Sequence, residues 1–126
     1  MDISFNRLTK LNSFFQQMRQ ENLPTTIAFK IYKLLKACET NLTFFQEEYT
    51  KLIQTYGATN EEGKYITQED GSITIKEGML EDCQAAIAKL NNEVATMPDI
   101  TFTEKELETI PNITIETLEW LEPFIA

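Results

Sequence analysis

Hydrophobic residues recur along most of this chain at alternating spacings of three and four, the pattern of helices that bury one face. The first such stripe contains Leu8, Leu11, Phe15 and Met18, and Ser4 stands before it as a candidate N-cap. This pattern predicts a helix over residues 4–20. Pro24 separates it from the next element because proline cannot continue a helix.

The most regular stripe follows Pro24 and keeps a heptad spacing over more than three repeats. Its members are Ile31, Leu35, Cys38, Leu42, Phe45, Tyr49, Leu52 and Tyr56. They predict one long helix over residues 26–56, and Gly57 follows as a typical C-terminal residue. A helix of this length needs partners that cover its stripe, because isolated helices are marginal in water.

The sequence then changes character. Residues 57–63 have the composition of a loop, and two short β-branched runs, 65–67 and 73–75, flank the pair Asp70-Gly71. This arrangement predicts a β-hairpin over residues 64–76. A further three–four stripe then predicts a helix over residues 77–97, which Pro98 ends. No internal repeat is apparent in the sequence.

Residues 98–126 predict a short C-terminal helical tail. Thr103 and Glu106 have the spacing of a capping box, and Thr114 is a candidate cap for a last turn or two that carries Trp120. The three stripes can cover one another if the helices pack antiparallel. We therefore expect a mainly α protein: an antiparallel three-helix bundle with a β-hairpin insertion, in a single domain over residues 1–126.

Charge divides the chain unevenly. The whole chain of 126 residues carries 11 basic and 20 acidic residues, a net charge of −9. Residues 1–56 have a net charge of +2, whereas residues 57–126 have a net charge of −11. No apolar run is long enough to span a bilayer, and the first residues lack the features of a signal peptide. We therefore expect a cytoplasmic protein with no membrane partner.

Candidate chemistry is sparse. The chain has no histidine, which removes the commonest general base and metal ligand. Cys38 and Cys83 fall on helical stripes, so we expect buried thiols in place of a zinc site. None of the four glycines opens a phosphate-binding loop. The sequence therefore predicts a protein that is not an enzyme and has no catalytic residues, cofactor or metal.

Three sets of residues are candidates for partner binding, and each has a purely structural interpretation beside the functional one. The carboxylates of the hairpin region either form a solvated turn or imitate the phosphates of a nucleic acid on a partner protein. The tail aromatics either fold back or dock a partner. The lysines of the long helix either form a solvated face or contact phosphates or an acidic partner, and the negative net charge argues against nucleic acid as the main ligand. The three sets are Glu61, Glu62, Glu69 and Asp70; Trp120 and Phe124; and Lys30, Lys33 and Lys36.

Four segments together resemble short hypothetical proteins of tailed phages and prophages, a family of unknown function: residues 5–11, 28–36, 56–63 and 121–125. The resemblance implies a phage context and assigns no role to any residue. We expect a protein that binds and modulates a host or phage protein, such as a defence or nucleic-acid enzyme, in the host cytoplasm. The alternative is a tail or head accessory protein that is incorporated in the virion. The long heptad helix leaves self-association open.

Overall fold

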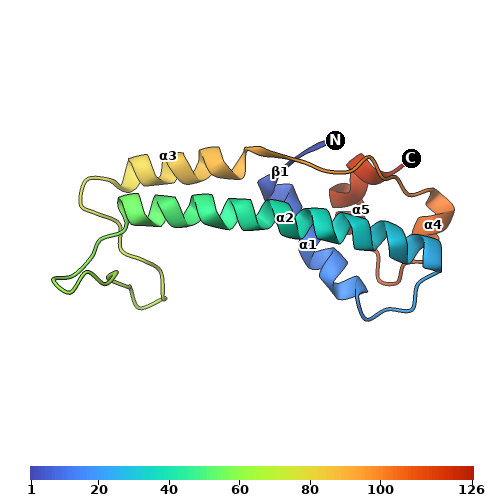
Figure 1. Ribbon diagram of the computed structural model, residues 1–126, viewed down its shortest axis with the longest axis horizontal. Coiled ribbons are helices and arrows are strands. Elements are labelled where there is room, and N and C mark those ends of the chain that lie inside the picture. Colours follow the sequence, from blue (N-terminus) through green and yellow to red (C-terminus); the bar gives the residue numbers. More distant parts are fainter. The chain divides into compact units, whose positions relative to one another are not determined.

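The computed structural model describes residues 1–126 and is mainly helical (Figure 1). Its residues form two compact units. Unit 1 contains Met1–Thr43 and Val94–Ala126, and unit 2 contains Phe44–Glu93. The long helix α2, Thr25–Tyr56, contributes residues to both units. The single domain and the three-helix bundle stay predictions, and the two units are described separately.

In unit 1, local signals set the start of the first helix. Helix α1, Phe5–Met18, begins after Ser4, whose side chain accepts a hydrogen bond from the backbone N–H of Arg7. Helix α2 begins at Thr25, directly after Pro24. Six residues of α1 are buried, and they coincide with the predicted stripe and its flanks: Phe5, Leu8, Leu11, Phe14, Phe15 and Met18. The sequence therefore predicted both helices and the buried face of α1.

The C-terminal region closes the core of unit 1. Helix α4, Glu104–Glu108, has the expected capping box between Thr103 and Glu106. Helix α5, Ile115–Leu121, is capped by Thr114, packs against α1 and runs into a short 3-10 turn, Glu122–Phe124. Phe102 donates its backbone N–H to the carbonyl oxygen of Phe124 at 2.6 Å. Phe102, Leu121 and Phe124 are at most 1% exposed, so the tail belongs to the core of unit 1.

A small sheet in unit 1 corrects the sequence-based prediction. Strand β1, Asp2–Ser4, pairs antiparallel with strand β2, Val94–Thr96, so Ile3 lies opposite Ala95. The sequence predicted helix at residues 92–97 because Val94 and Met97 continue the three–four stripe. The backbone of Val94–Thr96 instead pairs with the N-terminal strand, 90 or more residues away, and no local sequence pattern predicts such a pairing.

Unit 2 consists of the last part of α2, residues 57–79 and helix α3, Leu80–Asn91. In Figure 1, α3 runs alongside the C-terminal part of α2. The helix begins three residues later than the sequence predicted. Gly78, with a φ of 77°, occupies a turn in which the N–H of Met79 bonds the carbonyl oxygen of Lys76 at 3.0 Å. A positive φ at Gly78 is incompatible with helix, so α3 starts after it.

Residues 57–76 form more than the predicted hairpin. Three chain segments meet in a closed ring of backbone hydrogen bonds. The N–H of Ala58 bonds the oxygen of Thr74 at 2.8 Å, the N–H of Thr74 bonds Ile66 at 2.7 Å, and the N–H of Ile66 bonds Ala58 at 2.9 Å. The donors lie eight residues apart, so the segment is an eight-residue repeat used three times. We call residues 56–79 the turn ring.

The same period of eight governs the outer bonds of the turn ring. Three backbone N–H groups, eight residues apart, each donate to a carbonyl oxygen at 2.8 Å: Asn60 to Lys64, Gln68 to Ser72, and Lys76 to Tyr56. The turn at Gly63 and the turn at Gly71 each need a positive φ, 79° and 84°. Gly57 is needed for a different reason: a Cβ there would lie 2.6 Å from the carbonyl oxygen of Ile53. The chain therefore contains an internal repeat, contrary to the prediction from the sequence.

Candidate protein-binding surface

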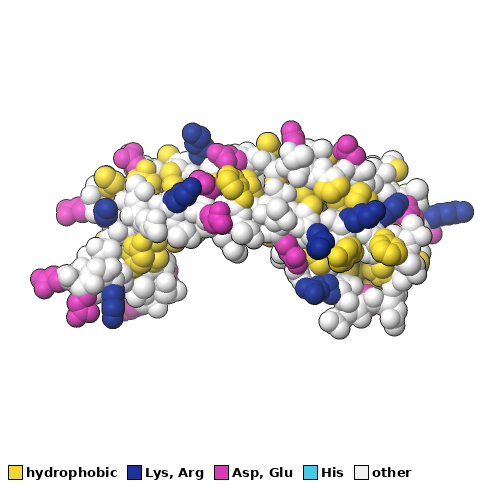
Figure 2. Space-filling model, in the orientation of Figure 1, with side chains coloured by type: hydrophobic (Ala, Val, Ile, Leu, Met, Phe, Trp, Pro, Cys, Tyr) yellow, Lys and Arg dark blue, Asp and Glu magenta, His cyan; other side chains and the backbone are white.

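The turn ring places the four candidate carboxylates at equivalent positions. Glu61 and Glu62 occupy the middle of the first turn, and Glu69 and Asp70 occupy the middle of the second. All four residues are exposed. Acidic side chains project from this segment of unit 2 in Figure 2. The structure therefore brings the sequence-predicted acidic residues together on neighbouring turns of one ring.

Side-chain hydrogen bonds fix these turns. The Oδ1 atom of Asn60 accepts from the N–H groups of Glu62 at 2.9 Å and Lys64 at 3.0 Å. The Oδ1 atom of Asp70 accepts from the N–H of Ser72 at 2.9 Å and from its hydroxyl at 2.6 Å. These bonds to Ser72 lower the pKa of Asp70, so its carboxylate stays ionised at neutral pH. The second turn thus carries a negative charge at a fixed position.

Few cations neutralise this surface. Unit 2 contains ten Asp and Glu residues and four Lys residues, a net charge of −6. Lys51 pairs with Glu48 at 2.9 Å, and Lys64 approaches Glu62 at 3.9 Å. Exposed pairs of this kind contribute little stability, but they do cancel charge locally. Glu61, Glu69 and Asp70 form no ion pair, so the turn ring presents a negative surface.

The tail residues lie in unit 1. Phe124 has no exposed surface, and Trp120 is half-buried with the Lys10 ammonium 5.9 Å from its ring centroid. The interpretation in which the tail packs onto its own unit fits this placement. A partner reaches Phe124 only if the tail comes away, so Phe124 lies outside the surface that we propose below.

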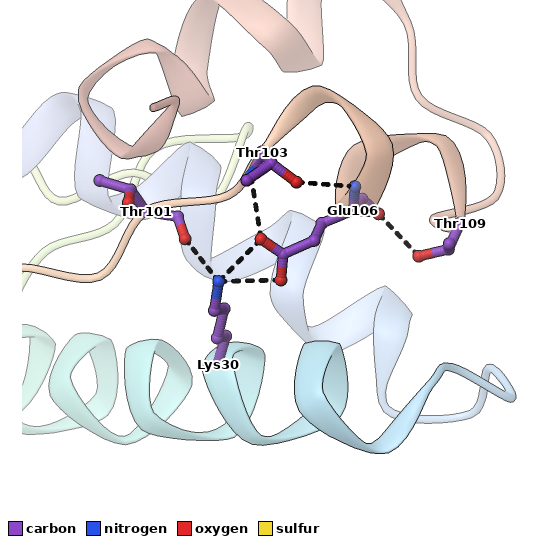
Figure 3. A network of polar contacts seen from close by, with 5 residues as sticks. All are labelled: Lys30, Thr101, Thr103, Glu106 and Thr109. Atoms are coloured by element: carbon purple, nitrogen blue, oxygen red, sulfur yellow. Dashed lines mark hydrogen bonds and ion pairs between the residues drawn. The ribbon is translucent and has the colours of Figure 1, made fainter.

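The lysines of α2 divide between structure and surface. Lys30 extends from α2 to the C-terminal region, where its Nζ atom lies 2.8 Å from both oxygens of Glu106 and 2.8 Å from the carbonyl oxygen of Thr101 (Figure 3). Lys30 therefore links α2 to the C-terminal region within unit 1. Its ammonium is also the main cause of the lowered pKa of Glu106. Lys33 and Lys36 remain exposed, and Lys36 lies over the ring of Tyr32 at 5.4 Å.

Both cysteines are buried and free. Burial raises the pKa of the Cys38 thiol to about 12, which keeps it protonated and unreactive. No group of three or more His, Cys, Asp or Glu side chains is placed to hold a metal ion. No helix is both long enough and apolar enough to cross a membrane.

Sequence reasoning missed one feature of this region, a hollow on unit 2. It has a volume of about 440 Å³ and lies between α2, α3 and the turn ring. Its walls come from segments up to 38 residues apart, from Tyr49 to Ile87, so no local sequence pattern predicts the hollow. The spacing of eight residues that relates Glu61 to Glu69 and Gly63 to Gly71 is the only sequence signal for the wall that the turn ring contributes to the hollow.

Comparisons with known proteins add no relative. The chain matches no family model, no curated protein and no solved structure.

Proposed function

We propose that this chain is a non-enzymatic phage protein that binds and modulates another protein of the phage or its host. The acidic turn ring is the part that meets the partner. The observation that supports this most is the ordered, repeated placement of Glu61, Glu62, Glu69 and Asp70 on a unit with a net charge of −6. Such a surface fits a basic partner, because complementary charges steer association and raise its rate.

The proposal includes the site of action and the chemical class of the partner. A basic surface that normally binds nucleic acid is the best fit, because carboxylates on adjacent turns can occupy the positions of phosphates. The protein then acts in the cytoplasm of the bacterial host. An antiparallel three-helix bundle remains part of this proposal, as the frame that carries the turn ring.

The second candidate is a structural or assembly component of the virion. The observation that favours it is helix α2, which has 32 residues and leaves part of its apolar stripe exposed. Helices of this kind pack against further helices in assemblies.

Affinity purification from infected cells, followed by mass spectrometry, separates the two candidates. Recovery of a host enzyme or a nucleic-acid-binding protein supports the modulator, whereas recovery of capsid or tail proteins alone supports the assembly component. The binding surface is then tested with the recovered partner and a variant that carries Glu61→Lys, Glu62→Lys, Glu69→Lys and Asp70→Lys. We expect binding to weaken at least about a hundredfold, because attraction is replaced by repulsion between close charges.

A matched control carries the same change in charge on unit 1. It contains Glu21→Lys, Glu108→Lys, Glu119→Lys and Glu122→Lys, all at exposed positions. Net charge alone acts equally in both variants, so only the turn-ring variant should lose binding at physiological ionic strength. Equal binding by the two variants would reject the turn ring as the surface.

A further inference from the structure

The hollow on unit 2 is lined almost entirely by apolar side chains. Its walls contain residues from three elements: Leu52 and Tyr56 of α2, Ile73 and Ile75 of the turn ring, and Cys83 and Ile87 of α3. No charged side chain lines it. Its volume of about 440 Å³ lies within the range of pockets that bind organic groups, about 300–1,000 Å³.

The residues of unit 2 leave this hollow open. Unit 2 has two buried hydrophobic residues, Cys83 and Leu90, although its part of α2 carries the heptad positions Tyr49, Leu52 and Tyr56. Tyr49 is 41% exposed, and the other two are half-buried. Apolar surface in contact with water is unfavourable by about 25 cal/mol per Å², so an apolar group that enters the hollow gains free energy. The shape and the lining therefore fit one bulky apolar side chain.

The edge of the hollow carries a fixed negative charge. Ser72 lines the hollow, and both its N–H and its hydroxyl hold the Oδ1 atom of Asp70. Asp70 is exposed and forms no ion pair, so its carboxylate remains open to a cation. The unit as a whole carries a net charge of −6, so a second copy of it would be repelled, whereas a basic segment would be attracted.

We propose that this hollow binds one aromatic or branched aliphatic side chain of a partner protein, from a segment that carries Lys or Arg beside it. The apolar side chain enters between α2, α3 and the turn ring, and a neighbouring cation pairs with Asp70. The proposal rests on the proposed function and adds to it the chemistry of the recognised segment. The apolar anchor supplies affinity, since the strongest interface residues occupy desolvated pockets, and the acidic turns supply attraction at longer range.

A display library of random peptides, selected on the immobilised full-length protein, tests this proposal. We expect the selected peptides to be rich in Lys and Arg and to share one Trp, Phe, Leu or Ile. Replacing that shared residue by Ser in a synthetic peptide should weaken its binding at least about tenfold. Two variants that fill the hollow from different elements, Ile87→Phe and Ile73→Phe, should weaken the parent peptide to a similar extent. Circular dichroism checks that each variant is folded.

The control is Ile115→Phe, the same substitution at a residue of unit 1 that is 78% exposed. It should leave binding unchanged. If basic peptides are selected but share no apolar residue, or if both filling variants bind as well as Ile115→Phe, the hollow is not the anchor site and the proposed function survives. If the selected peptides are neutral or acidic, or if none is enriched, the anchor proposal and the proposed acidic surface both fail. A small apolar molecule retained in native mass spectra would replace the peptide as the occupant.

Discussion

The two units use the same long helix in opposite ways. In unit 1, α2 buries Ile27, Ile31, Leu34, Leu35 and Cys38. In unit 2, the same three–four spacing continues, yet no α2 residue of that unit is buried. Hydrophobic spacing therefore identifies the face of a helix that can be covered. Whether that face is covered depends on what the rest of the chain supplies.

Burial as a whole follows the same division. Of the 21 buried hydrophobic residues, 19 belong to unit 1, so the core that holds the fold together lies there. Unit 1 also exposes large side chains, among them Phe29 at 60% and Ile115 at 78%. The difference between the units thus lies in what is buried. Unit 2, which has a small core, a negative surface and an open apolar hollow, is the unit in which we propose that a partner binds.

The largest expected difference between the units comes from one substitution made twice on α2. Leu34→Ala removes a side chain with no exposed surface in unit 1 and should lower the free energy of unfolding by about 2–5 kcal/mol. Leu52→Ala removes a half-buried side chain in unit 2 that already lines the hollow, so its cost should be about 1 kcal/mol. Urea denaturation followed by circular dichroism measures both. Equal costs would mean that the two parts of α2 are equally covered.

Thiol labelling compares the local opening of the two units. Cys38 has no exposed surface in the core of unit 1, and Cys83 lies in the wall of the hollow. A reagent reaches Cys38 only when the core opens, and burial keeps that thiol protonated, with its pKa raised to about 12. Cys83 should therefore react at least about tenfold faster than Cys38. Mass spectrometry of the variants Cys38→Ala and Cys83→Ala, labelled separately under native conditions, measures the two rates.

The outcome of the labelling is informative in either direction. Each variant retains a single thiol, so the assignment does not depend on peptide mapping. Reaction of Cys38 at the rate of Cys83 would show that the core of unit 1 opens as readily as the hollow, which would remove the contrast between the units.

The parts of the fold that the sequence predicted depend on neighbouring residues. Ser4, Thr103 with Glu106, and Thr114 cap helices where their spacing predicts it, and Pro24 stands where α2 begins. These signals need only a few residues of context. The mainly helical fold and the long helix were therefore predictable.

The parts that the sequence missed depend on distant partners. Val94–Thr96 continues a helical stripe, but its backbone pairs with Asp2–Ser4. Residues 57–60 have a loop composition, but Ala58 closes the turn ring through Ile66 and Thr74. The candidate carboxylates could be located on a turn because Asp-Gly is a local signal, and the spacing of eight between Glu61 and Glu69 indicates that their turns are equivalent. The hollow beside them has no such local signal.

The smallest expected effect concerns acid stability and the ion pair of unit 1. The Lys30 ammonium and the N–H of Thr103 bind the Glu106 carboxylate, and its pKa is lowered mainly by Lys30. A carboxyl group whose pKa is lower in the folded state stabilises the fold above its unfolded value, about 4.3, and this stabilisation is lost as the pH falls through the folded value.

The variant Lys30→Met should therefore be less stable than the parent protein at pH 7, by a few degrees in the unfolding midpoint. The two midpoints should approach each other as the pH falls below about 4.3 and should meet below the lowered pKa of Glu106, since protonated Glu106 no longer needs a cation. Asp70 in unit 2 should behave differently. Ser72 lowers the pKa of Asp70, but this carboxyl group is exposed and lies outside the core. The variant Ser72→Ala should therefore have the same unfolding midpoint as the parent protein, both at pH 7 and in acid. Melting curves recorded by circular dichroism across this pH range test both statements. A gap between Lys30→Met and the parent that persists in acid would show that Lys30 acts through its bond to the Thr101 carbonyl oxygen and its position 5.6 Å from the Phe102 ring, and not through Glu106.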